Sequence, residues 1–520
     1  MPNVVIAFVR NQRLREVAKW APVGFVLFGP LMPIALIIWL IMRRFSRSPK
    51  PAPWTARFAE ADELAPFIVP ARTPLTGENI PLAHFLGDRL LVLSPGSLGA
   101  RELPHVLVYA PTRSGKSTHA ISTLLSWGYS AVVVDPKGEL WRHTAGYVAA
   151  SGRRPIQLSP GEMGVPYDPW IEAHSDAELR ALAEAIAPAY TTAALPYAEG
   201  TQMLIVTLAR LARRLQQPAG HVLAAALQLG PLNCLKALYA LGGEQRADAL
   251  RVASLSGADL STITPERVSR TMLGQAWSGF ARSWDLMCDS ASIGAMSKSF
   301  LTPGVLRQER IVVYLHVPLT HADRYAPWLR LMTVSLVRGA MRHHDDIPLL
   351  VILDEAGVIG LPALPDLLAY GAGQGVTFIV YAQARSQLER WYGRDGLAAL
   401  EANARCKLIW PTQDYATAEH VSRMLGKTTI ARYTGQYYAE APRELITADE
   451  FMKLPGTSIL VLLLGIPPVI AQRIEWWNIP WMVERSSISP PPVEEIAPAD
   501  VGALVKRLKG LAAGITFGKS

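Results

Sequence analysis

The stretch VYAPTRSGKSTHA, from Val108 to Ala120, carries the strongest signal for the fold. It matches the phosphate-binding pattern G-x-x-x-x-G-K-[ST] except at the first position, where Ala110 replaces a glycine. In such a loop, backbone N–H groups and the start of the next helix surround a phosphate, while a lysine reaches the outer phosphates and a hydroxyl binds Mg²⁺. Lys116 and Ser117 supply these two groups, and Ala110 lies where the chain leaves a strand, so its methyl group is a small steric demand. Taken alone, the pattern could also be a surface turn that contains lysine and serine. We expect a nucleotide-binding loop made of Ala110, Pro111, Thr112, Arg113, Ser114, Gly115, Lys116, Ser117 and Thr118.

A second motif, PLLVILDEAG, is an apolar run that ends in Asp354 and Glu355. A carboxylate at the end of a strand can hold Mg²⁺ opposite Ser117, and a second one beside it can orient the attacking water. The next apolar run, VTFIVYAQ, ends in Gln383, where a sensor of the terminal phosphate would lie. Each polar residue alone could simply follow a strand, but their combination is much more specific. The predicted cofactors are ATP and Mg²⁺, the metal ligands Ser117 and Asp354, and the catalytic residues Lys116, Asp354, Glu355 and Gln383.

The order of apolar runs predicts one α/β domain with a helical insertion. HVLVYA and SAVVVD are separated by a helical stretch, which is typical of a βαβ unit in a parallel sheet. From Ser175 to Ser299 helical patterns dominate; Ser175 and Glu178 form a capping box, and leucines recur at helical spacing from Leu204 to Leu215. The strand signals return with RIVVYLHV and continue to SILVLLLG. We therefore expect a membrane anchor at 1–50, a linker into the domain at 51–83, the nucleotide-binding α/β domain at 84–174 and 300–485, an all-α insertion at 175–299, and a C-terminal linker and tail at 486–520.

The composition sets limits on the class of protein. The three cysteines are widely spaced with no C-x-x-C pair, which argues against a disulfide framework and a structural zinc site. A formal charge of +8 suits contact with nucleic acid or anionic lipid without choosing between them.

One segment near the N-terminus predicts insertion into a membrane. Ala21 to Met42 is an uncharged, largely apolar run long enough to cross a hydrocarbon core, and it ends directly in basic residues rather than at a cleavage site. Basic residues flank both sides, so the positive-inside rule does not orient it. Because an ATP site needs cytoplasmic nucleotide, we expect everything after Met42 to lie in the cytoplasm.

From His105 to Trp477 the chain resembles the type IV secretion coupling proteins, the TraG/TraD-type ATPases of conjugation. The resemblance rests on APTRSGKS, LLSWGYSAVVVDPKGELWRHTAGY, PYDPW, VILDEAG, the long stretch from SQLERWYGRDG to GKTTI, and PRELITADEFMKLP. It implies a RecA-like P-loop NTPase domain with an all-α insertion, a transmembrane anchor in the bacterial inner membrane, and a hexameric ring. It also implies that Lys116 and Ser117 bind phosphate and Mg²⁺, Asp354 the Mg²⁺ sphere, Glu355 the attacking water and Gln383 the terminal phosphate. Ala110 is tolerated in this family.

The chain departs from the family pattern in three places. Only Ala21 to Met42 is a convincing membrane crossing, whereas the family usually has two, and the C-terminal tail is not strongly acidic. An arginine that acts across the subunit interface is expected between Glu355 and Gln383, yet residues 356–382 contain neither arginine nor lysine. Either another residue, such as Arg385 or Arg394, takes this role, or hydrolysis is slow.

These observations favour an ATP-driven motor that recruits a relaxase–DNA complex and delivers it to the channel of a type IV secretion system, contacting DNA without reading its sequence. The alternative is a receptor ATPase for secreted effector proteins that does not translocate DNA. A membrane kinase is a third reading, but no phosphate-acceptor signature supports it.

Overall fold

The computed structural model describes residues 55–161, 163–189, 194–257, 263–317, 324–343, 347–433 and 438–515. The predicted transmembrane segment, Ala21 to Met42, lies outside these residues. Among the helices within them, none combines the length and apolar character that a membrane crossing requires. The chain divides into two units. The smaller unit includes an antiparallel hairpin of β11 (Lys427–Tyr433) and β12 (Tyr438–Glu444), and the larger one holds everything described below.

Twelve strands of the larger unit form one mixed sheet in the order β1-β3-β2-β14-β13-β10-β4-β9-β8-β5-β7-β6. The strands from β10 to β6 in this order are parallel, and the remainder extend the sheet in antiparallel fashion. Every residue of β5, β7, β8 and β9 is buried, as expected for apolar parallel strands covered on both faces. The strands are β1 (Ile68–Pro70), β2 (Ile80–Phe85), β3 (Arg89–Leu93), β4 (Val106–Tyr109), β5 (Ser130–Val134), β6 (Arg154–Leu158), β7 (Ile311–Leu315), β8 (Leu349–Leu353), β9 (Val376–Ala382), β10 (Cys406–Ile409), β13 (Ser458–Leu463) and β14 (Val469–Gln472).

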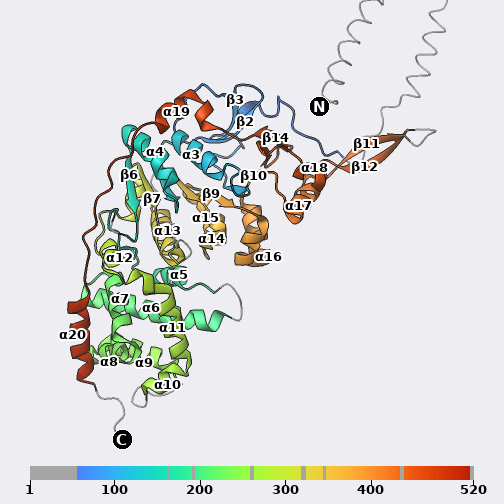
Figure 1. The fold of residues 1–520 in the computed structure, drawn as a ribbon. Helices are drawn as coiled ribbons and strands as arrows, with labels where there is room; N and C mark the ends of the chain where they lie inside the picture. Colours follow the sequence, from blue (N-terminus) through green and yellow to red (C-terminus); the bar gives the residue numbers. More distant parts are fainter. Residues whose placement is uncertain are drawn as a thin grey trace, which may run out of the picture. The chain divides into compact units, whose positions relative to one another are not determined.

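Helices cover both faces of the parallel part of the sheet (Figure 1). On one face lie α3 (Lys116–Ser126), α4 (Glu139–Ala150) and α19 (Pro480–Ser486). On the other lie α13 (Ala326–Met341), α14 (Ala356–Ile359), α15 (Leu364–Gly371) and α16 (Arg385–Asn403). Helices α17 (Tyr415–Leu425) and α18 (Ala448–Met452) pack against each other. Short 3-10 helices occur at Ala65–Phe67, Asp285–Met287, Pro303–Arg307, Ala372–Gln374 and Trp476–Asn478.

An all-α block follows β6 in the chain, where helical patterns dominate the sequence. The predicted capping box is present, because Ser175 Oγ accepts from the Glu178 backbone and the Glu178 carboxylate accepts from the Ser175 backbone. Leu204, Leu208, Leu211 and Leu215 are all buried. The block consists of α5 (Asp176–Ile186), α6 (Leu195–Leu215), α7 (Ala219–Leu229), α8 (Pro231–Ala240), α9 (Gly243–Ser254), α10 (Pro265–Ser269), α11 (Met272–Trp284) and α12 (Ser290–Ala295).

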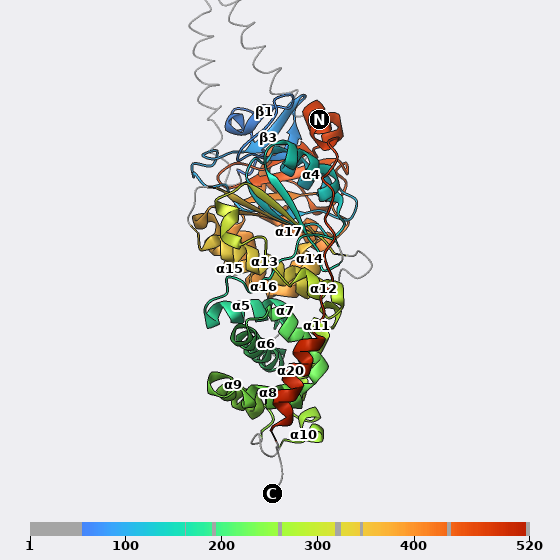
Figure 2. The ribbon, with the colours of Figure 1, turned by 90° about the vertical axis from the view of Figure 1, so that its left-hand side faces the viewer.

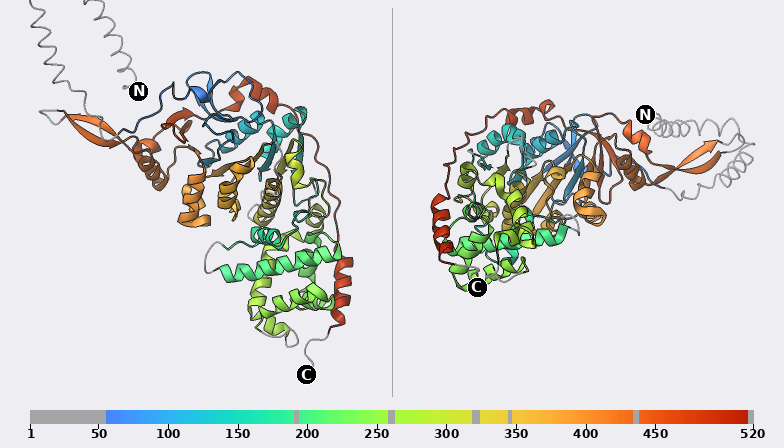
Figure 3. Two further views of the ribbon diagram at one scale, coloured as in Figure 1. Left: turned by 180° about the vertical axis from the view of Figure 1, so that it is seen from behind. Right: turned by 60° about the horizontal axis from the view of Figure 1, so that its bottom comes forward.

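Two of the predicted linkers contain regular structure. The range 51–83 includes β1 and most of β2, whose Ile80, Leu82 and Ala83 are fully buried because β2 pairs with β3 on one side and β14 on the other. In the predicted tail, α20 (Gly502–Ala513) buries Val505, Leu508 and Ala512 and packs against α7 and α8 (Figures 2 and 3).

Candidate nucleotide-binding site

The predicted site residues follow three of four neighbouring parallel strands. In the sheet these strands run β4-β9-β8-β5, so their carboxyl ends meet at one edge. The phosphate-binding loop follows β4, Gln383 follows β9, and Asp354 and Glu355 follow β8. The fourth strand, β5, leads into the turn that contains Lys137. Residues far apart in the sequence are thus brought to one place by the order of the strands.

The loop between β4 and α3 has the backbone of an anion cradle. Arg113 and Gly115 have positive φ angles of 63° and 111°, and only glycine adopts the second without strain. The Lys116 ammonium donates to the carbonyl oxygens of Ala110 and Pro111 at 2.8 and 3.0 Å, so it lies across its own loop. Burial lowers the pKa of Lys116. The fully buried Ala110 donates its N–H to Ala382 O at 3.0 Å, which ties the loop to β9, and its methyl group is part of the hydrophobic core.

Asp354 has the environment of a ligand that awaits a cation. Its side chain is 2 % exposed, and among the described residues its Oδ1 has no hydrogen-bond partner. Burial, and then the neighbouring charge of Glu355, raise the pKa of Asp354 to about 7. A buried carboxylate without a partner is costly, and a divalent cation would relieve that cost. The residue therefore fits Mg²⁺ on the evidence of its own unpaired oxygen.

Glu355 is held by side chains on both of its oxygens. Lys137 Nζ lies 2.9 Å from Oε1, and Gln383 Nε2 donates to Oε2 at 3.0 Å. Burial opposes ionisation of Glu355, but these two hydrogen bonds and the charges of Lys137 and Lys116 together hold its pKa below the usual value. The Thr112 hydroxyl donates to Gln383 Oε1 at 3.3 Å, so the network reaches the phosphate loop. Glu355 also has a left-handed φ of 63°, a strain that in proteins concentrates at functional sites.

Lys137 belongs to the stretch DPKGE, which contributes to the family resemblance but for which the sequence predicted no role. The structure brings its ammonium onto Glu355. The turn that carries it is well defined: Gly138 N–H donates to Asp135 O at 3.1 Å, and Asp135 Oδ2 accepts from Trp141 N at 2.8 Å. The signal that could have revealed Lys137 is the position of the stretch, because it follows a strand of the same parallel sheet.

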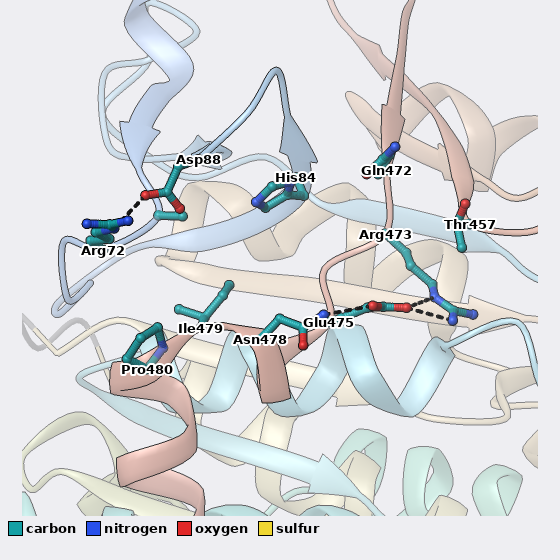
Figure 4. Close-up of a pocket in the computed structure, with 11 residues that line it drawn as sticks. Arg72, His84, Asp88, Thr457, Gln472, Arg473, Glu475, Asn478, Ile479 and Pro480 are labelled. Carbon is teal, nitrogen blue, oxygen red and sulfur yellow. Dashed lines mark hydrogen bonds and ion pairs between the residues drawn. The ribbon is translucent and has the colours of Figure 1, made fainter.

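Arg473 is a second residue that no motif indicated. It follows β14 in the antiparallel part of the sheet, yet its Nη1 donates to Ser114 O at 3.4 Å. Its Nη2 also pairs with Glu475 Oε1 at 2.8 Å. Arg473 and Glu475 line a cavity of about 490 Å³ between the β2–β3 hairpin and the segment after β14 (Figure 4). Arg473 therefore contacts the phosphate loop and also lines this pocket.

The two arginines considered as catalytic partners are engaged elsewhere. Arg385 pairs with Glu401 through Nε at 2.9 Å and Nη2 at 3.2 Å, and it also approaches Glu389. The side chain of Arg394 is 92 % exposed and lies 3.5 Å from Glu389. Within the described part of this chain, the cation in direct contact with the Glu355 carboxylate is instead Lys137.

Two family models match the parts of the chain that contain the predicted site residues. A family model described as "Type IV secretory system Conjugative DNA transfer" matches residues 73–205, which include the phosphate loop and DPKGE. A second, described as "TraM recognition site of TraD and TraG", matches residues 348–456, which include Asp354, Glu355 and Gln383.

Individual relatives and solved structures are similar to this chain over most of its length. A conjugal transfer protein TraG of Escherichia coli is 27% identical, with 75% of this chain and 70% of TraG covered. Protein VirD4 of Rhizobium rhizogenes is 24% identical over 72% of this chain, which spans 59% of VirD4. The plasmid coupling protein TrwB, solved with ADP and Mg²⁺, has a TM-score of 0.54 at 19% identity and covers 71% of this chain and 85% of TrwB. TrwB bound to a non-hydrolysable GTP analogue has a TM-score of 0.56 at 18% identity and covers 76% of this chain and 95% of TrwB. The fold is thus the RecA-type α/β fold of TrwB.

Proposed function

Because this chain belongs to the coupling proteins of type IV secretion and conjugation, we propose that it is an ATP-hydrolysing motor that drives a relaxase-bound DNA strand into the secretion channel. One observation carries the proposal. The phosphate loop, the unpaired Asp354 carboxylate, Glu355 and Gln383 meet at one edge of a parallel sheet.

The phosphates bind in the loop after β4. Lys116 leaves the carbonyls of Ala110 and Pro111 and turns to the outer phosphates, while the backbone N–H groups and the start of α3 contact the others. Arg473 lies beside Ser114, and the cavity that it lines takes the nucleoside. The capture of ADP and of non-hydrolysable ATP and GTP analogues by TrwB supports this assignment.

Ser117 and Asp354 hold Mg²⁺, which when bound neutralises charge on the phosphate oxygens. Glu355 takes the proton of the attacking water, and Gln383 orients that water and detects the terminal phosphate. Glu355 suits this role because its carboxylate is ionised and stands at the strand end next to Asp354.

The motor acts on DNA without reading its sequence. The net charge of +8 supports contact with phosphates, and the match to the conjugative DNA transfer family favours DNA over secreted proteins as the cargo. The match to the TraM recognition family supports contact with the relaxosome. The chain is anchored in the bacterial inner membrane through Ala21 to Met42, with the ATPase body in the cytoplasm, and it assembles as a homo-hexamer.

The test is ATP hydrolysis by the purified chain with and without single-stranded DNA, together with conjugative transfer in cells. Lys116→Ala should abolish both activities, because the ammonium that neutralises the outer phosphates is lost. Lys509→Ala is a control, since Lys509 is exposed on α20 and lies outside residues 348–456 and away from the phosphate loop. Stimulation by DNA should fall steeply as salt is raised.

Two outcomes would count against the proposal. Transfer that is unaffected by Lys116→Ala would rule out an ATP-driven motor. Hydrolysis that responds to an effector protein but not to DNA would favour a receptor for secreted proteins instead.

A further inference from the structure

The catalytic edge contains a cation for which the predicted chemistry has no role. Lys137 comes from a different strand end than the phosphate loop, and its ammonium lies 2.9 Å from Glu355 Oε1. Gln383 occupies the other oxygen of the same carboxylate. Each oxygen of the proposed base therefore already accepts one hydrogen bond, and the one on Oε1 comes from an ammonium that stabilises the ionised carboxylate and so opposes its taking a proton from water. Movement of Lys137 away from Glu355 would remove this opposition.

The mechanical properties of Lys137 suit a residue that moves between two partners. The backbone of Lys137 is held in place, because the turn from Asp135 to Gly138 is closed by a backbone hydrogen bond and Pro136 restricts the chain just before Lys137. Its side chain is a flexible four-carbon stem that is 43% exposed, so rotation of the stem does not require repacking of the core. A compact ammonium on such a stem can follow the stronger of two nearby negative charges.

The electrostatic surroundings place Lys137 in the same site as the phosphate loop. Burial lowers the pKa of Lys116, and the charge of Lys137 contributes to that lowering, so the two ammonium groups act on one another. Both also act on Asp354, against the larger effects of burial and of Glu355. A bound triphosphate would place several negative charges among these groups, which would then compete with Glu355 for Lys137.

The sequence explains why such a cation is needed. Residues 356–382 contain no arginine or lysine, so this segment cannot supply a cation to a neighbouring subunit. Arg385, the next arginine along the chain, is held by Glu401. Phosphoryl transfer accumulates charge on the terminal phosphate, and a cation at that position contributes strongly to the rate.

We propose that Lys137 is a phosphate-sensing cation that holds Glu355 when no nucleotide is bound and moves to the terminal phosphate when a nucleoside triphosphate binds. The move frees Glu355 Oε1 to accept a proton from water and supplies positive charge from within the same subunit. A diphosphate lacks the terminal group and leaves the Lys137–Glu355 pair in place. This inference rests on the proposed ATPase function.

The experiment measures the binding of ADP and of a non-hydrolysable ATP analogue, with Mg²⁺, to the purified full-length chain, and separately kcat and KM for ATP. The variants are Lys137→Met and Lys137→Gln, which remove the charge, and Lys137→Arg, which keeps it. Lys453→Met is the matched control, because it breaks an exposed lysine–carboxylate pair away from the site. Binding of ADP also reports whether each variant is folded.

We expect Lys137→Met and Lys137→Gln to lose about tenfold in affinity for the ATP analogue, as for the loss of one charged hydrogen bond, while the affinity for ADP changes less than about threefold. The value of kcat should fall on the order of 10²-fold, with a smaller effect on KM. Lys137→Arg should recover most of the preference for the triphosphate, and Lys453→Met should behave as the unmodified chain.

Three results would overturn the inference while leaving the proposed function intact: an unchanged preference for the triphosphate, an equal loss of affinity for both nucleotides, or faster hydrolysis in the charge-removing variants. The last would mean that Lys137 only restrains Glu355. If the unmodified chain binds neither nucleotide, the proposed function fails and the inference fails with it.

Discussion

At the scale of single residues, the site is built from charges that are expensive to bury. Asp354 is 2 % exposed and has an oxygen without a partner among the described residues, whereas Glu355 next to it pairs with the Lys137 ammonium and accepts a hydrogen bond from Gln383. Adjacent carboxyl groups therefore have pKa values displaced in opposite directions. Such a difference suits the two roles proposed for them, a metal ligand for Asp354 and a base for Glu355.

The raised pKa of Asp354 predicts how stability depends on pH. In the unfolded chain its pKa is ordinary, about 4, and in the folded chain it is about 7. Between these values the folded chain binds more protons, so the free energy of unfolding should fall as pH rises from about 4 to about 7 and then level off. The Asp354→Asn variant removes this penalty. Without nucleotide and metal, it should be as stable as the unmodified chain near pH 4 and more stable above pH 7, by at most about 4 kcal/mol.

Urea unfolding of the full chain at several pH values would measure this difference. Asp449→Asn is a suitable control, because Asp449 is an exposed residue that pairs with Lys453. A stability difference between Asp354→Asn and the unmodified chain that does not vary between pH 4 and pH 8 would contradict the assigned environment.

At the scale of elements, α4 connects the site to the C-terminal segment. Its first turn follows Lys137, and farther along it Gly146 lies against the backbone of Ile488. The segment continues along the unit: Gly164 N–H donates to Glu494 O at 2.9 Å, and Ala499 N–H donates to Ser290 O at 2.9 Å (Figure 1). Residues 488–499 are thus fixed by backbone contacts to both the α/β domain and the all-α block, which is more order than a proline-rich sequence indicates.

Gly146 should be essential for this contact. A Cβ at position 146 would overlap the backbone carbonyl group of Ile488. Because the overlap is with backbone atoms and not with the end of a flexible side chain, it could be relieved only by a shift of the backbone. Gly146→Ala should destabilise the chain by about 1–3 kcal/mol and make residues 488–500 accessible to protease. Gly510→Ala is the control, because a Cβ there meets nothing within 4 Å and alanine favours the helix. Limited proteolysis and thermal unfolding of both variants measure the effect; equal behaviour would show that the segment is not held at α4.

At the scale of the larger unit, the all-α block is completed by the end of the chain. Helix α20 buries Val505, Leu508 and Ala512 against α7 and α8, although more than 250 residues separate them in the sequence (Figure 2). The block is therefore an insertion in the sequence but is closed by a later helix. Its stability depends on that helix, and the nucleotide site lies on other elements.

This separation predicts that stability and nucleotide binding respond differently to changes in α20. Leu508 is 1% exposed, so Leu508→Ala should lower the free energy of unfolding by about 2–5 kcal/mol. The same change at the half-buried Leu511 should cost less. Nucleotide affinity should change less than about twofold in both variants, because their contacts lie on α7 and α8 and not on the strand ends. Thermal unfolding and a nucleotide titration test this; a strong loss of affinity in Leu508→Ala would mean that the block and the site are coupled.

Most of the parallel sheet could be predicted from the sequence, because each buried strand appears there as a short continuous run of apolar residues. The runs HVLVYA, SAVVVD, RIVVYLHV, PLLVILDEAG and VTFIVYAQ all became strands β4, β5, β7, β8 and β9. The capping box of α5 was equally readable, since its two residues are three positions apart. The residues expected at the catalytic edge also meet there, because each followed a strand whose direction the βαβ pattern determined.

The phosphate loop, the parallel strands and the polar residues at their ends could thus be read from the chain, since each depends on interactions within a few residues or on a repeating pattern. Three contacts could not be read in this way: Lys137 pairs with Glu355, Arg473 reaches Ser114, and α20 covers the helical block. These contacts join residues hundreds of positions apart. These contacts depend on the order of the strands in the sheet and on which apolar faces of the helices are left to be covered. Both are properties of the whole chain and cannot be read from any short stretch of it.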